Sequence, residues 1–115
     1  MRDPAPRTTS AAPPGTAVRF AEAARAIGES ARARGLVVPA FRSPPRLGEV
    51  DRTIRRRRGG GATIAICLKD RPWPAVLADM VEGVVVTNDL DGAEAMRART
   101  ALWEALDSHL GDVAA

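Results

Sequence analysis

Apolar residues recur at helical spacing in two long stretches of the chain. In the first, the apolar positions lie three or four residues apart: Phe20, Ala23, Ala24, Ile27 and Ala31. That period predicts a helix that begins at Thr16, reaches about Arg34 and is ended by Gly35. The second stretch begins at residues 91–94, Asp-Gly-Ala-Glu, which have the form of a capping box. It predicts a helix to about Leu110, with a buried stripe formed by Met96, Trp103, Leu106 and Leu110.

Between these helices the pattern changes to short apolar runs separated by glycine and proline. Residues 50–57 and 62–69 flank three consecutive glycines, residues 59–61, and predict a β-hairpin. The second arm is apolar on both faces, which is typical of a central strand covered by helices on each side. Residues 36–38 predict another short strand, and residues 39–48, which contain three prolines, predict a loop.

The stretch after the hairpin is less regular. Pro74 is suited to open a helix over residues 75–81, because its missing N–H is not needed in the first turn. Gly83 is expected to end that helix. Residues 84–86, all valine, then predict a short strand, with continuation of the helix as the alternative.

Together these elements predict an α/β fold. We expect one small domain over residues 16–115, with a short mixed sheet, helices on both of its faces and the element order α-β-β-β-α-β-α. Residues 1–15 contain four prolines and no apolar periodicity, so they predict a disordered tail.

Length and composition narrow the class of protein. A chain of 115 residues has room for one domain, and its single cysteine, Cys67, cannot form an internal disulfide. A lone cysteine favours a reducing compartment. No apolar run approaches the ~20 residues of a membrane span, and the N-terminus lacks the apolar segment of a secretory signal. We therefore expect a cytoplasmic protein without a membrane partner.

The net charge of +3 is unevenly distributed. Residues 1–58 contain 13 arginines against five acidic residues, a net charge of +8, whereas residues 59–115 carry −5. Such a chain is suited to bind phosphates through its basic half, or another protein through either half. The acidic C-terminal helix makes a homodimer, or another protein–protein interaction, one of the alternatives.

The most distinctive run is Arg55-Arg56-Arg57-Arg58, directly before the three glycines. Strand alternation places Arg55 and Arg57 on one face and Arg56 and Arg58 on the other. Neither face can then be buried, so the tip of the hairpin is expected to project into solvent. Three further arginines extend this basic patch: Arg42, Arg46 and Arg52.

Guanidinium groups gathered in this way predict a non-catalytic module that binds nucleic acid or an acidic protein surface. Contacts of this kind provide affinity and strong salt dependence but no reading of sequence. Aromatic residues are only 3% of the chain, too few for a platform on which single-stranded bases stack. The alternative is a solvated hairpin end with no ligand.

A second hypothesis comes from residues 48–51, Gly-Glu-Val-Asp, and from the order helix, three strands, helix, strand. The order resembles the core of the PD-(D/E)XK nuclease superfamily. The tetrapeptide resembles a segment of its YraN-type, Holliday-junction-resolvase-like members. The resemblance implies a metal-dependent nuclease in which Asp51 binds Mg²⁺ and acts with Lys69 in catalysis.

The chain departs from that family pattern on the third strand. A Glu-x-Lys element is expected there, and this chain has Cys67-Leu68-Lys69. Mg²⁺ prefers oxygen ligands, and a thiol is a poor substitute for a carboxylate. We therefore expect a binding module without a cofactor, and keep the nuclease as the alternative. The simplest interpretation of Asp51 and Lys69 is a solvated ion pair.

Overall fold

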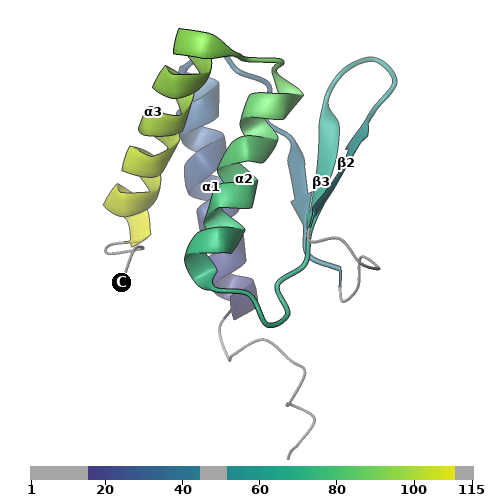
Figure 1. Ribbon diagram of the computed structural model, residues 1–115, viewed down its shortest axis with the longest axis vertical. Helices are drawn as coiled ribbons and strands as arrows, with labels where there is room; N and C mark the ends of the chain where they lie inside the picture. Colours follow the sequence, from purple (N-terminus) through teal and green to yellow (C-terminus); the bar gives the residue numbers. More distant parts are fainter. Residues whose placement is uncertain (1–15, 45–51, 111–115) are drawn as a thin grey trace, which may run out of the picture.

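The computed structural model describes residues 16–44 and 52–110. Its elements follow in the order α1 (Thr16–Ala33), β1 (Ala40–Arg42), β2 (Arg52–Arg56), β3 (Ala62–Ile66), α2 (Trp73–Thr87) and α3 (Gly92–Leu110). Figure 1 shows the helices gathered on one side of the sheet, with the turn between β2 and β3 extending beyond it. The α/β class and the short mixed sheet are confirmed.

The sheet has the strand order β1-β3-β2, so β3 is its central strand. β1 runs parallel to β3, and β2 runs antiparallel to it. The antiparallel pair is the predicted hairpin, which closes with Arg56 opposite Ala62. Residues 59–61 between the arms have φ values of 85°, 107° and 85°. Because glycine adopts positive φ without steric cost, the triglycine run permits this return of the chain.

A hydrophobic core fills the space between the sheet and the helices. Ile64 and Ile66 of β3 are fully buried there, and Phe41 of β1 and Ile54 of β2 pack beside them. Alternation along the strands places these side chains on one face, which is the inner face of the sheet. α2 lies directly on this face and contributes five fully buried side chains: Val76, Leu77, Met80, Val81 and Val84.

α1 and α3 pack against each other through small side chains. The face predicted for α1 is confirmed, since Phe20, Ala23, Ile27 and Ala31 are buried and Ala24 is partly buried against the core. The buried stripe of α3 consists of Ala95, Ala98, Ala101, Leu102 and Leu106. Met96, which was expected in that stripe, is 67% exposed. Leu106 is buried as expected, and Trp103 packs partly against the core, whereas Ala95 rather than Met96 faces the interior in the first turns of α3.

The valines at residues 84–86 do not form the expected strand, and the helical alternative is confirmed. Gly83 lies inside α2 rather than at its end. A Cβ atom on Gly83 would lie 3.2 Å from Cγ1 and 3.3 Å from Cγ2 of Ile64. The glycine therefore permits close contact between α2 and β3. Burial of the neighbouring Val84 and Val85 outweighs the roughly 1 kcal/mol by which glycine disfavours a helix.

The connection from α1 to the sheet also differs from expectation. Residues 36–38 are not a strand, and β1 lies instead within the predicted loop, at Ala40–Arg42. Leu36 and Val38 pack against the core. The backbone of Val37 between them is bound by the side chain of Asn88 at the end of α2. Hydrogen bonds that a strand partner would supply come here from a side chain.

Helices cover one face of the sheet in the described part of the chain, rather than both faces as expected (Figure 1). The second cover was expected because Ala65 and Cys67 made the outer face of β3 apolar. Ala65 is small, and its neighbours in the strand register are Arg42 and Thr53. Among the described residues, no helix lies above Ala65, which is 9% exposed and lines a shallow depression on this face.

Two further expectations concern the N-terminal tail and the absence of a membrane-spanning segment. The predicted tail, residues 1–15, lies outside the described residues. Within the described ranges, none of the helices combines the length and the apolar character needed to cross a membrane.

Candidate functional site

Strand β2 directs its arginines alternately to the two faces of the sheet. Arg52 and Arg56 contact α2 and the residues that follow it, so they lie on the inner side. Arg55 and, just after the strand, Arg57 lie on the outer side, where both border one depression. The alternation predicted for this run is therefore present, and it divides the arginines into two groups with different surroundings.

Arg56 is bound to the C-terminal end of α2. Its Nη2 donates to the carbonyl oxygen of Val86 at 2.8 Å and to Oδ1 of Asp89 at 2.9 Å. Its Nη1 donates to the carbonyl oxygen of Thr87 at 3.5 Å. The last carbonyls of a helix lack partners within the helix and carry partial negative charge. Arg56 donates to two of them, of which Val86 also accepts from the Asp89 N–H at 3.1 Å, so the charge of Arg56 is used within the fold.

Arg52 is bound at the other end of β2. Its Nη1 lies 3.2 Å from Oδ1 of Asp79 on α2, and Nη2 of Arg71 lies 2.7 Å from Oδ2 of the same carboxylate. Arg71 also donates to the carbonyl oxygen of Cys67 at 3.2 Å. The Asp79 side chain is only 19% exposed. Arg52 therefore joins the base of the hairpin to α2.

Three arginines lie on the outer side of the sheet and come from both of its edges. In the strand register, Arg42 of β1 lies beside Ala65, and Arg55 of β2 lies beside Thr63. Together with Arg57 they border a depression of about 440 Å³. We call this surface the arginine face, and its residues are Arg42, Pro44, Thr53, Arg55, Arg57, Thr63 and Ala65.

Arg57 is held in place on the arginine face by Thr63. Its Nε and Nη2 both donate to Thr63 Oγ1, at 3.2 Å and 2.9 Å. The guanidinium group presents five N–H donors in a planar fork. The donors on Nη1 are therefore left to meet a ligand, with the plane of the group already oriented.

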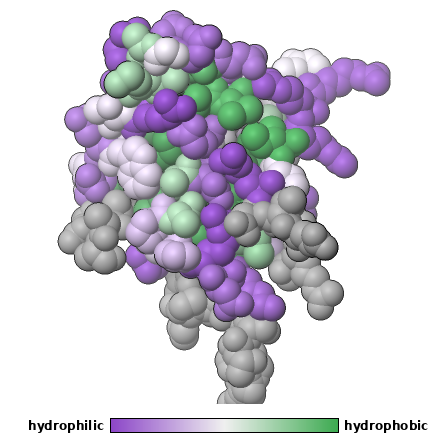
Figure 2. All heavy atoms as spheres, viewed as in Figure 1, coloured by the Kyte–Doolittle hydropathy of each residue, from purple (hydrophilic) through white to green (hydrophobic). Residues whose placement is uncertain are grey.

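Among the described residues, no acidic group pairs with the arginines of the arginine face. In the described part of the chain, ion pairs involve Arg52, Arg56, Arg71 and Arg99, and none involves the arginine face. Arg58, in the exposed turn, is likewise without a carboxylate partner in that part. Figure 2 shows hydrophilic side chains projecting into solvent at this end of the molecule.

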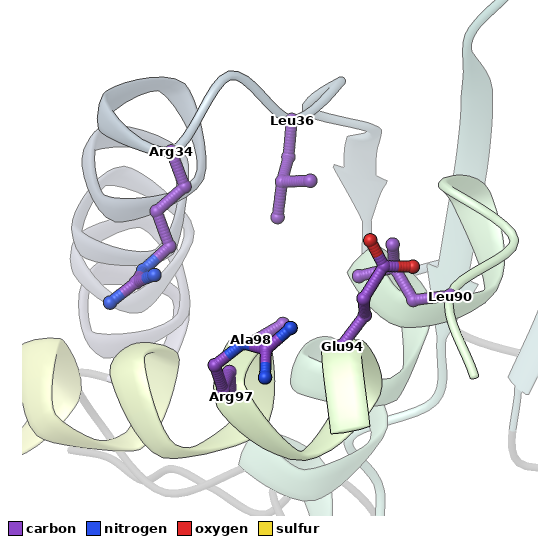
Figure 3. A pocket seen from close by; sticks show the side chains of 6 residues that line it. All are labelled: Arg34, Leu36, Leu90, Glu94, Arg97 and Ala98. Carbon is purple, nitrogen blue, oxygen red and sulfur yellow. The ribbon is translucent and has the colours of Figure 1, made fainter. Parts of the chain in front are cut away.

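A second hollow has a different charge pattern. It occupies about 210 Å³ between the end of α1 and the start of α3, and its lining residues are Arg34, Leu36, Leu90, Glu94, Arg97 and Ala98. Figure 3 shows Glu94 and Arg97 side by side on α3, opposite Arg34. One carboxylate therefore accompanies the two arginines. This hollow is less suited to an anion than the arginine face.

The remaining candidate residues are not brought together by the described structure. Asp51 and Arg46 lie outside the described residues. Lys69 is exposed in the turn after β3, and Cys67 is partly buried just beyond the last residue of that strand. Across residues 16–44 and 52–110, no three His, Cys, Asp or Glu side chains are placed to hold a metal ion. The nuclease hypothesis stays a prediction.

Comparison with protein-family models, with curated proteins and with solved structures finds no match to this chain. The assignment of the candidate site is therefore based on the geometry of the structure.

Sequence reasoning missed the threonines of this site. Thr53 lies two residues before Arg55, so strand alternation alone places both on one face. Thr63 was not identified because its role depends on the register of the hairpin, which pairs it with Arg55.

Proposed function

We propose that the protein binds nucleic acid through phosphate contacts made by the arginine face. One observation supports this most directly. Arg42, Arg55 and Arg57 lie together without a carboxylate partner in the described structure, whereas Arg52 and Arg56 of the same strand are paired internally. If these arginines served only the stability of the fold, we would expect them to be paired with carboxylates as Arg52 and Arg56 are.

The chemistry of the surface favours a phosphate backbone over an acidic protein. Protein interfaces usually have an apolar, often aromatic centre. The arginine face has Thr63 and Ala65 at its centre and arginines at its margins. Arginine donates two parallel hydrogen bonds to a phosphate and stays charged at every physiological pH. The proposed activity is binding without catalysis.

The test is the salt-dependent binding of a labelled DNA duplex, measured by fluorescence anisotropy. The wild-type chain is expected to bind at low salt and to lose affinity as salt rises. A triple variant, Arg42→Ala, Arg55→Ala and Arg57→Ala, is expected to lose at least tenfold in affinity. The matched control replaces three exposed helical arginines, Arg25, Arg32 and Arg97, with alanine and so has the same net charge.

Three outcomes would contradict the proposal. The first is no binding by the wild-type chain at low salt. The second is an equal loss in both triple variants, since general charge rather than this surface would then account for binding. The third is equal or tighter binding of a poly-glutamate peptide of matched charge, which would indicate an acidic protein partner instead. Circular dichroism of each variant verifies that it is folded.

A further inference from the structure

The geometry of the arginine face points to a more specific ligand: we infer that it binds double-stranded nucleic acid, with one phosphodiester backbone of the duplex lying along β3. This inference rests on the proposed function and adds the form of the nucleic acid and its direction on the sheet. It is carried by the shape of the face, by the fixed position of Arg57 and by the location of the aromatic side chains.

The face has a low centre and raised charged margins. Its centre is β3, whose outward side chains there, Thr63 and Ala65, are short. Arg42 stands on β1 on one side, and Arg55 stands on β2 on the other. Neighbouring strands lie about 4.8 Å apart, so the two margins are separated by roughly 10 Å. A single phosphodiester backbone fits between such margins when it runs parallel to β3.

Arg57 gives this channel a fixed donor. Its two hydrogen bonds to Thr63 Oγ1 orient the guanidinium over the central strand before any ligand is present. A side chain that is already ordered loses less conformational freedom on binding. A regular, stiff backbone benefits most from donors at fixed positions, because neither partner must then be rearranged. Thr63 acts here as a positioning residue.

The aromatic residues argue against a single-stranded ligand. The chain has four aromatic side chains, and all are in the core or packed against it: Phe20, Phe41, Trp73 and Trp103. Proteins that bind single strands gain about tenfold or more in affinity for each base stacked on an aromatic ring. This face has no such ring, so its affinity comes from phosphate charge alone. A duplex offers one charge per ~1.7 Å of axis, twice the density of one strand.

The experiment compares a 20-base-pair duplex, its separate single strand and inorganic polyphosphate, each titrated with the full chain at several salt concentrations. We expect the duplex to bind at least tenfold more tightly than the single strand. If Arg42, Arg55 and Arg57 each neutralise one phosphate, the slope of log affinity against log salt is about −2.7. Each single alanine variant of these residues is expected to reduce that slope by about 0.9, while Arg97→Ala leaves it unchanged.

A pair of variants tests the position of Arg57 without removing charge. Thr63→Val keeps the shape of the side chain but removes the oxygen that accepts from Arg57, and it is expected to weaken duplex binding several-fold. Thr63→Ser retains the hydroxyl, and this variant is expected to bind the duplex as tightly as the wild-type chain. Equal losses in the two variants would overturn the positioning role.

The outcomes separate this inference from the proposed function. Equal or tighter binding of the single strand overturns the duplex inference and leaves nucleic-acid binding in place. Equal binding of polyphosphate, compared per charge, also overturns it, because the face would then recognise phosphate without the form of a duplex. Absence of binding to all three ligands at low salt overturns both proposals.

Discussion

The side-chain amide of Asn88 pairs with the backbone of Val37 in the way a neighbouring strand would. Its Oδ1 accepts from the Val37 N–H at 2.8 Å, and its Nδ2 donates to the Val37 carbonyl at 2.9 Å. The same Nδ2 donates to the carbonyl of Val84 at 2.9 Å. One residue therefore joins the end of α2 to the connection between α1 and β1.

Asn88→Ala is expected to lower the free energy of unfolding by about 0.5–1.5 kcal/mol, because it removes two hydrogen bonds to the backbone of Val37, which water can replace at this exposed position. Asn88→Asp is expected to destabilise at least as much. It replaces the donating amide with a carboxylate that faces carbonyl oxygens at the negative end of a helix. Urea unfolding measures the stability of both variants. The control is Asp107→Ala, a change at an exposed position of α3. A loss below about 0.5 kcal/mol for Asn88→Ala would mean that this contact is unimportant.

Gly83→Ala is expected to destabilise the fold although alanine favours helices. The added Cβ would meet Ile64 at 3.2 Å and 3.3 Å, and such overpacking costs about 1–3 kcal/mol. Gly28→Ala in α1 is the matched control, since the nearest atom to its added Cβ is Val38 Cγ1 at 3.5 Å. We expect that variant to gain up to about 1 kcal/mol. In an Ile64→Ala background the penalty at Gly83 should disappear, and its persistence would place the strain elsewhere.

The ion pair between α2 and α3 predicts a pH dependence. Arg99 donates from Nε and Nη2 to the two carboxylate oxygens of Glu82, at 2.6 Å and 3.0 Å. Hydrogen bonding from Arg99 lowers the pKa of Glu82 below its ordinary value of 4.5 and outweighs the opposing effect of burial. A lowered pKa in the folded state stabilises the fold above the unfolded pKa. That stability is lost as the pH falls through the folded pKa.

Glu82→Gln is therefore expected to lower Tm by about 2–4 °C at pH 7, a modest change because both side chains are more than a third exposed. The difference from wild type should shrink below pH 4.5 and vanish once the carboxyl of the wild-type chain is protonated. Thermal unfolding followed by circular dichroism across this range measures the effect. Glu104→Gln, an exposed change on α3, is the control. A pH-independent difference would contradict the ionic origin.

The two groups of arginines on β2 should respond differently to substitution. Arg52→Ala removes one partner of Asp79 and is expected to lower the free energy of unfolding by about 1 kcal/mol. Arg55→Ala, on the exposed outer face, is expected to change it by less than about 0.5 kcal/mol while weakening nucleic-acid binding. Chemical unfolding and anisotropy titration of the same two variants compare the effects. If the two variants lost the same unfolding free energy, the internal pairing of Arg52 would contribute no more to stability than the exposed side chain of Arg55.

The local patterns in the sequence predicted the hairpin and the first helix well. Both depend on short-range information, namely the triglycine turn and the spacing of Phe20, Ala23, Ile27 and Ala31. The alternation of Arg55 and Arg57 with Arg56 was also readable, because a strand has a fixed period of two residues.

The features that the sequence did not reveal depend on contacts between distant segments. Gly83 was expected to end a helix, and only its contact with Ile64 explains why the helix continues. β1 is placed by a parallel pairing with β3, about 23 residues later in the chain, and no local pattern specifies that partner. For the same reason, the internal pairing of Arg52 and Arg56 was not anticipated, since their partners lie 27 and 33 residues away.

Strand β3 serves two layers of the molecule at once. Ile64 on its inner side supports α2, and its immediate neighbours, Thr63 and Ala65, form the centre of the outer surface. Any displacement of the backbone at Ile64 must therefore move both neighbours, because in the described part of the chain a single strand separates the interior from that surface. A substitution in the core can thus change the shape of the arginine face without altering a single charged residue.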